Sequence, residues 1–196
     1  MTSRLGLFGG TFDPVHVGHL VVAQEVRHAL ALDKVLLVVA NEPWQKMGQP
    51  DLTPAEERFA VTSAAVDGIE GLEASRLELD RGGPSYTVDT VREIGVSDPG
   101  AEVFLIVGAD VAAEIGSWER VDELADLVKL VIVDRPSALA AEDPSGFDVL
   151  RVRSPSLDVS SSNLRRRLRE GRPVRFLVPD AAIRCIRERG MYSGGR

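Results

Sequence analysis

Residues 4–20, which read RLGLFGGTFDPVHVGHL, decide the fold because they contain three kinds of local structure in succession. Arg4–Phe8 is a short apolar run typical of a buried strand, and the glycines after it indicate a turn. From Gly18 to Leu32 the apolar residues recur at helical spacing. The stretch therefore predicts a strand, a glycine turn and a helix, which is the opening unit of an alternating α/β fold.

The rest of the chain repeats this alternation about five times. Residues 72–79 read as a strand, for example, and the capping box Thr53-Pro54-Ala55-Glu56 predicts a helix that runs to about residue 66. Alternating strands and helices indicate a parallel sheet with helices on both faces. We therefore expect an α/β fold with a doubly wound parallel sheet of about five strands. It would form one domain over residues 1–196, with a helical C-terminal subregion at 155–196.

Composition excludes several classes of protein. The net charge is −7, which argues against a binder of duplex nucleic acid. Cys185 is the single cysteine and no apolar run approaches the ~20 residues of a membrane helix, so we expect a soluble, cytoplasmic protein. Six arginines lie between Arg165 and Arg175, against the single acid Glu170. This stretch indicates either a site for a small anion or a solvated helix face.

The segment after the first strand is the first place to look for a ligand, since ligands of such sheets bind beyond the carboxyl ends of the strands. It matches neither the G-x-G-x-x-G fingerprint nor the phosphate loop. His16 and His19 are three residues apart at the start of the expected helix, where free N–H groups suit phosphate. The two histidines could bind a metal, could be structural residues that cap and pack the helix, or could contact a polyphosphate. We favour the contact with a polyphosphate.

Gly9–Leu20 resembles the signature of the HxGH nucleotidyltransferase superfamily, and its full form is similar to that of the nicotinate-nucleotide adenylyltransferases. Other segments resemble this family's motifs in the same order: Gly82–Thr90 (GGPSYTVDT), Gly108–Asp110 followed by Trp118, Val159–Arg165 (VSSSNLR) and Phe176–Pro179 (FLVP). One segment departs from the pattern. The family often has P-P-H-K where this chain has Pro43-Trp44-Gln45-Lys46, which keeps the lysine and loses the histidine.

The resemblance implies an enzyme of NAD biosynthesis that joins ATP and nicotinate mononucleotide, giving nicotinic acid adenine dinucleotide and pyrophosphate. The catalytic residues implied are His16, His19 and Arg165. The ATP-binding residues implied are Gly9, Gly10, Phe12, Gly108, Asp110, Ser160, Ser161 and Ser162. The residues implied to bind the pyridine nucleotide are Thr11, Lys46, Tyr86, Thr87 and Trp118.

Adenylyl transfer needs no protein nucleophile, because the acceptor phosphate supplies the attacking oxygen; positioning and charge neutralisation suffice. We expect Mg²⁺ as cofactor, held by phosphate oxygens and water without a dedicated metal site. The expected partners are ATP and nicotinate mononucleotide, with no nucleic acid, no membrane and a possible homo-oligomer.

Two alternatives remain open. Phosphopantetheine adenylyltransferase shares the chemistry, but the G-P-S-Y-T segment and the longer chain speak against it. A non-catalytic nucleotide-binding regulator would use the same fold, but loss of His16, His19 or Arg165 would be expected there, and all three are present.

Overall fold

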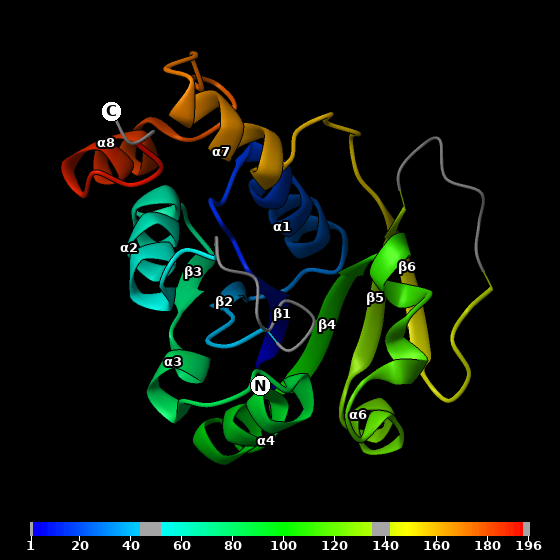
Figure 1. Cartoon of the computed structure of the whole chain (residues 1–196). Helices are drawn as coiled ribbons and strands as arrows, with labels where there is room; N and C mark the ends of the chain where they lie inside the picture. Colours follow the sequence, from blue (N-terminus) through cyan, green and yellow to red (C-terminus); the bar gives the residue numbers. More distant parts are fainter. Residues whose placement is uncertain (1, 44–51, 135–141, 194–196) are drawn as a thin grey trace.

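The computed structural model describes residues 2–43, 52–134 and 142–193, and these form a parallel sheet with helices on both faces (Figure 1). The strands are β1 (Arg4–Gly10), β2 (Lys34–Val39), β3 (Leu72–Ser75), β4 (Glu102–Gly108), β5 (Lys129–Asp134) and β6 (Asp148–Arg153). Their order across the sheet is β3-β2-β1-β4-β5-β6, so the direction of winding reverses between β1 and β4. The doubly wound parallel sheet is confirmed, with six described strands rather than about five.

Helices cover the two faces of this sheet and enclose two apolar cores. They are α1 (Val17–Ala29), α2 (Ala55–Val66), α3 (Leu77–Arg81), α4 (Thr87–Ser97), α5 (Ala109–Ala112), α6 (Val121–Leu127), α7 (Ser161–Arg169) and α8 (Asp180–Glu188), with a 3₁₀ turn at Ile115–Ser117. One core joins α1, α2, α7 and α8 to the sheet, and the other joins α4, α5 and α6 to it. Each strand of the middle of the sheet is therefore buried on both faces, as its continuous apolar run predicts.

Two predicted boundaries are wrong. The strand expected over 72–79 ends at Ser75, and α3 begins at Leu77. The capping box at Thr53 does not form, since the residue before α2 is Pro54. Thr53 makes tertiary contacts instead: its N–H donates to Asp13 Oδ2 at 3.3 Å and its carbonyl accepts from Arg58 Nε at 2.8 Å.

The C-terminal helices lie against the loop that follows β1. Ser161 Oγ, in the first turn of α7, donates to the carbonyl of Pro14 at 2.9 Å, and the N–H of Val17 donates to the carbonyl of Leu177 at 3.0 Å. Figure 1 shows α7 beside α1, and α8 packs on α2. The end of the chain thus supports the segment that carries the paired histidines. Within the described ranges, no helix is both long and apolar enough to cross a membrane.

Candidate active site

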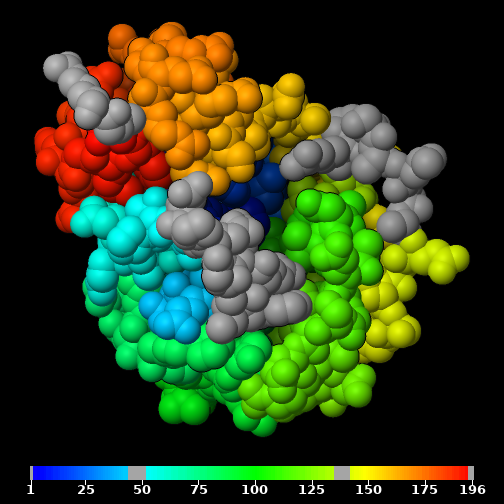
Figure 2. All heavy atoms as spheres, viewed as in Figure 1, coloured from blue at the N-terminus to red at the C-terminus, as the bar shows by residue number. Residues whose placement is uncertain are grey.

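Two cavities open at the carboxyl ends of β1 and β4, where the winding of the sheet reverses. We call them the α4 cavity and the α1 cavity after the helix that borders each. The α4 cavity, of about 470 Å³, contains Gly9, Gly10 and Thr11 together with Thr87 and Trp118 in its lining. In Figure 2 the dark blue N-terminal residues are visible at the bottom of a hollow between the orange and green parts of the chain. The cavities therefore occupy the position where sheets of this topology bind ligands.

The α1 cavity, of about 510 Å³, lies beside the α4 cavity and shares part of its wall. His16, His19, Ser160 and Ser161 are in its lining. The residues common to the two linings are Phe8, Gly108, Asp110 and Val111. Asp110 is exposed in the first turn of α5, directly after the carboxyl end of β4. One ligand that reaches past Asp110 can thus occupy both cavities.

The two predicted histidines stack on one another at the start of α1. Their ring centroids are 3.7 Å apart and the ring planes differ by 22°. The backbone N–H of His16 donates to His19 Nδ1 at 3.2 Å, so this nitrogen is an acceptor and the neutral ring carries its proton on Nε2. A Cβ added at Gly18 would lie 3.1 Å from the His16 ring. The glycine between the histidines therefore gives the His16 ring its space.

The side chain of Phe12, expected among the ATP-binding residues, points away from both cavities. Its side chain is 2% exposed, belongs to the core and is absent from the lining of both cavities. The ring meets the His19 ring edge-on with centroids 5.0 Å apart. A Cβ at Gly10 would lie 2.7 Å from the Phe12 ring, so this approach requires a glycine there. Phe12 supports a histidine, which leaves only its backbone for a ligand.

Arg165 reaches the loop in front of the histidines rather than the interior of a cavity. Its Nη1 donates to the carbonyl of Asp13 at 2.6 Å and lies 3.7 Å from Asp13 Oδ2. Ser160, the residue before α7, caps this helix by accepting from the N–H of Asn163 at 3.4 Å. Ser162 is exposed and lies outside both linings. The structure thus brings Arg165 to the histidine loop, and separates Ser162 from the other two serines.

Of the residues predicted to bind the pyridine nucleotide, some line a cavity and others do not. Thr87, at the start of α4, and Trp118 both line the α4 cavity. Tyr86 packs against the core under α4 and is absent from the linings of both cavities. Lys46 lies outside the described residues.

The segment before α4 is fixed by the loop after β2. Asn41 Nδ2 donates to the carbonyl of Gly83 at 3.0 Å, and the N–H of Ser85 donates to the carbonyl of Glu42 at 3.0 Å. Ser85 and Pro43 line the α4 cavity. The two loops therefore form one rim of this cavity.

Arg58 is a residue of the site that the sequence did not reveal. This arginine of α2 is fully buried and donates to the carbonyls of Thr11 (2.8 Å), Asn41 (3.1 Å) and Thr53 (2.8 Å). Burial lowers the pKa of Arg58, an effect that nearby carboxylates, Asp13 foremost, oppose. It therefore holds the loops after β1 and β2 at one point. In sequence, Arg58 follows two glutamates in a helical window and looks like a surface residue.

Asp13 and Tyr192 are two further residues with a place in the site. Asp13 is 3% exposed, and its Oδ1 accepts from the Tyr192 hydroxyl at 2.6 Å. Tyr192, near the end of the described chain, thus fixes Asp13, which precedes His16 by three positions. Only the place of Asp13 within the G-T-F-D-P stretch signalled its importance.

The comparisons with known proteins agree with this geometry. The chain belongs to the cytidylyltransferase-like family, whose model matches residues 7–167, and it is therefore a nucleotidyltransferase. Its relatives in Corynebacterium kroppenstedtii and Thermus thermophilus both carry the name "Probable nicotinate-nucleotide adenylyltransferase". The first is 42% identical over 96% of this chain and 90% of its own length, the second 44% over 96% and 99%. The family expected from residues 9–20 is confirmed.

A solved structure shows the same fold. The nicotinic acid mononucleotide adenylyltransferase of Plasmodium falciparum, complexed with NaAD, superimposes with a TM-score of 0.78 over 97% of each chain. The two sequences are 18% identical, so this likeness concerns the arrangement of the sheet and helices.

Proposed function

We propose that the two cavities together bind ATP and nicotinate mononucleotide, and that His16, His19 and Arg165 serve the transfer between them. The reaction joins these substrates to give nicotinic acid adenine dinucleotide and pyrophosphate, a step of NAD biosynthesis, and it is the activity that the relatives' name states. The observation that carries the proposal is the shared wall of the cavities at Phe8, Gly108 and Asp110. A dinucleotide product needs two adjoining subsites, and this wall provides them.

The α1 cavity is suited to the triphosphate. His19 presents Nε2–H as a donor, and the N-termini of α1 and α7 contribute partial positive charge. Ser160 and Ser161 add hydroxyl groups at the start of α7. Negative charge that develops on the transferring phosphoryl group and on pyrophosphate would be stabilised there. Arg165 brings a guanidinium to the same loop through its contact with Asp13.

The α4 cavity is suited to the pyridine nucleotide. We assign Trp118 to stacking on the ring, and the start of α4 at Thr87 to its carboxylate. Between the cavities, Asp110 can accept hydrogen bonds from a ribose hydroxyl, and the backbone of Gly9 and Gly10 allows close approach. The acceptor phosphate then faces the α-phosphorus of ATP, where alignment of the reacting groups supplies much of the rate.

A divalent cation is the usual companion of nucleotidyl transfer from ATP, and we propose Mg²⁺. Within the described residues no group of three or more His, Cys, Asp or Glu side chains could hold a metal ion. We propose that phosphate oxygens and water hold most of the coordination positions of the ion. Such an ion would neutralise phosphate charge.

The test is a comparison of acceptors. The protein is incubated with ATP, Mg²⁺ and one of nicotinate mononucleotide, nicotinamide mononucleotide or phosphopantetheine, and pyrophosphate release is measured. We expect the highest kcat/KM with nicotinate mononucleotide. Turnover with phosphopantetheine alone would assign the chain to the alternative adenylyltransferase, and binding of ATP without turnover of any acceptor would indicate a regulator.

A further inference from the structure

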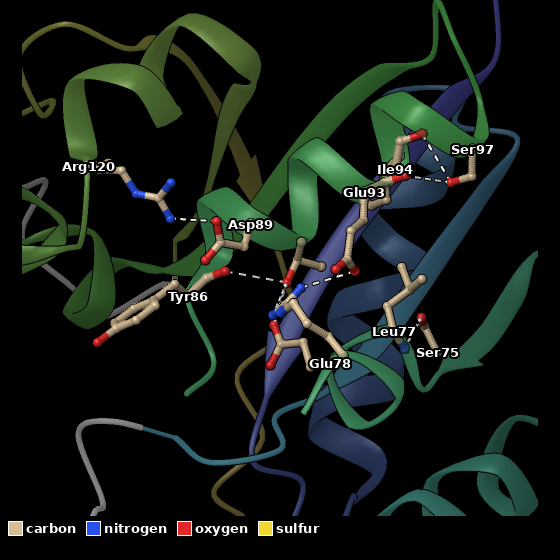
Figure 3. A network of polar contacts seen from close by, with 11 residues as sticks. Ser75, Leu77, Glu78, Tyr86, Asp89, Glu93, Ile94, Ser97 and Arg120 are labelled. Atoms are coloured by element: carbon tan, nitrogen blue, oxygen red, sulfur yellow. Dashed lines mark hydrogen bonds and ion pairs between the residues drawn. The ribbon is translucent and has the colours of Figure 1, made fainter. Parts of the chain in front are cut away.

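Two ion pairs join α4 to the segment that begins α6. Arg120 Nη2 donates to Asp89 Oδ1 at 2.5 Å, and Arg92 pairs with Glu123. Figure 3 shows the Arg120 side chain directed at Asp89 on α4. Arg120 has the left-handed backbone conformation, with φ 50°, that non-glycine residues seldom adopt. The hydrogen bond to Asp89 places this guanidinium between α4 and the start of α6.

The Asp89–Arg120 pair connects the two segments that contribute Thr87 and Trp118 to the α4 cavity, although neither member lines it. Asp89 is the third residue of α4, two positions after Thr87, and Arg120 is two positions after Trp118. Thr87 and Trp118 both line the cavity. The Tyr86 side chain makes no capping hydrogen bond, so the first N–H groups of α4 lack a side-chain acceptor from the N-cap position. The charge state of the pair thus acts on the part of the cavity that we assign to the ring carboxylate.

Carboxylates predominate among the charged groups near this end of α4. A carboxylate in the first turn of a helix offsets the partial positive charge of the N-terminus. Two more carboxylates, Glu78 and Asp110, occur in the described lining of the cavity. Glu78 is 6% exposed; its Oε1 accepts from Thr90 Oγ1 at 2.8 Å, and its Oε2 has no hydrogen-bond partner among the described residues. Asp89 adds a third carboxylate two positions after Thr87. Among the described residues, the guanidiniums that contact this part of α4 are those of Arg81, which donates to Thr90 Oγ1 at 3.2 Å, and Arg120.

We propose that Arg120 is a specificity-determining residue that makes the α4 cavity select an acid over an amide on the pyridine ring. It neutralises Asp89, so that the N-terminus of α4 keeps its positive character for a carboxylate ligand. The neutral amide of nicotinamide mononucleotide gains much less from that charge. The inference rests on the proposed binding of the pyridine nucleotide in this cavity, and it assigns Arg120 a positioning and electrostatic role without contact with the reacting atoms.

The central experiment measures kcat/KM of the Arg120→Gln variant for nicotinate and nicotinamide mononucleotides. We expect the acid-to-amide ratio to fall about 10-fold, mainly through a higher KM for the acid, because Asp89 then repels the ring carboxylate. Arg120→Lys should keep most of the ratio, since it restores the positive charge. The double variant Asp89→Asn/Arg120→Gln should also recover it, because the repelling carboxylate is gone.

Arg92→Gln is the matched control. It removes an arginine–glutamate pair between the same two helices, one turn further from the start of α4. We expect its acid-to-amide ratio to equal that of the wild type. An equal loss with both substrates in Arg120→Gln, without recovery in the double variant, would overturn the inference and leave a packing role. Failure of the proposed function would appear separately, as wild-type protein that does not turn over the acid.

Discussion

His19 presents its chemistry through one atom, Nε2, since Nδ1 accepts the N–H of His16. We expect His19→Ala to lower kcat by at least ~100-fold, as removal of one donor to a developing negative charge typically does. His28→Ala is the control, because His28 is exposed on the same helix. Pyrophosphate release measures turnover, and thermal unfolding checks that both variants fold. Wild-type turnover in His19→Ala would remove His19 from the mechanism.

The sequence indicated which residues lie near the cavities where their position follows from a motif and a strand end. His16, His19, Thr87, Asp110 and Trp118 all line a cavity as expected, and their chemical roles stay predictions. The sequence did not indicate the orientation of residues whose side-chain direction is decided by packing in the core. Phe12 occurs in the same motif, but the direction of its ring depends on packing against Phe8 and His19. Arg58 could not be found, because its acceptors come from three loops distant in sequence.

At the scale of elements, α2 fixes the site through Arg58. Replacing Arg58 by methionine would leave three loop carbonyls without this donor, so we expect the free energy of unfolding to fall by about 3 kcal/mol. Arg189→Met is the matched control, since Arg189 joins α8 to Glu57 of α2 at the exposed surface and its loss should change stability little. Urea unfolding measures both variants. Equal stability of the two would contradict the role of Arg58.

Helices and strands with a clear hydrophobic periodicity or a capping residue were predictable from the sequence. Elements whose conformation depends on tertiary contacts were not. The start of α7 at Ser160 follows from its capping serine, as the hydrogen bond to Asn163 shows. By contrast, the sequence after Ser75 alternates like a strand, but the buried contact between Glu78 and Thr90 belongs to α3. The short helix α5 was also missed, because four residues carry too little periodicity to be recognised.

At the scale of the whole molecule, the Tyr192–Asp13 bond joins the two ends of the described chain. Burial, followed by the hydrogen bond to Asp13, raises the pKa of Tyr192 well above its ordinary value of 10.0. The unfolded chain therefore ionises this phenol first, and the stability it contributes below pH 10 falls as the pH rises further.

We therefore expect wild-type protein to lose more stability between pH 9 and pH 11 than Tyr192→Phe, by up to about 1.4 kcal/mol for each pH unit above 10. Denaturant unfolding at several pH values measures the difference. Parallel pH profiles for the two proteins would show that the phenol ionises equally in both states.

The sheet, and the edge at which the two cavities open, could be predicted because continuous apolar runs and glycine turns act locally. The attachment of the chain end to the histidine loop could not, since Asp13 and Tyr192 are 179 positions apart. The strand expected near Val149–Val152 is present as β6 (Asp148–Arg153), so the sheet has six described strands rather than about five. The single-domain organisation with a subregion at 155–196 stays a prediction.

The common wall of the two cavities has a consequence for inhibitor design. Under the assignment proposed above, a compound that tethers a pyridine carboxylate to an adenosine would place its second half beside the second cavity once the first half has bound. The second contact then benefits from a high effective concentration, provided that the tether spans the distance past Asp110. The length of the tether would therefore affect the potency of the inhibitor more strongly than additional substituents on either ring.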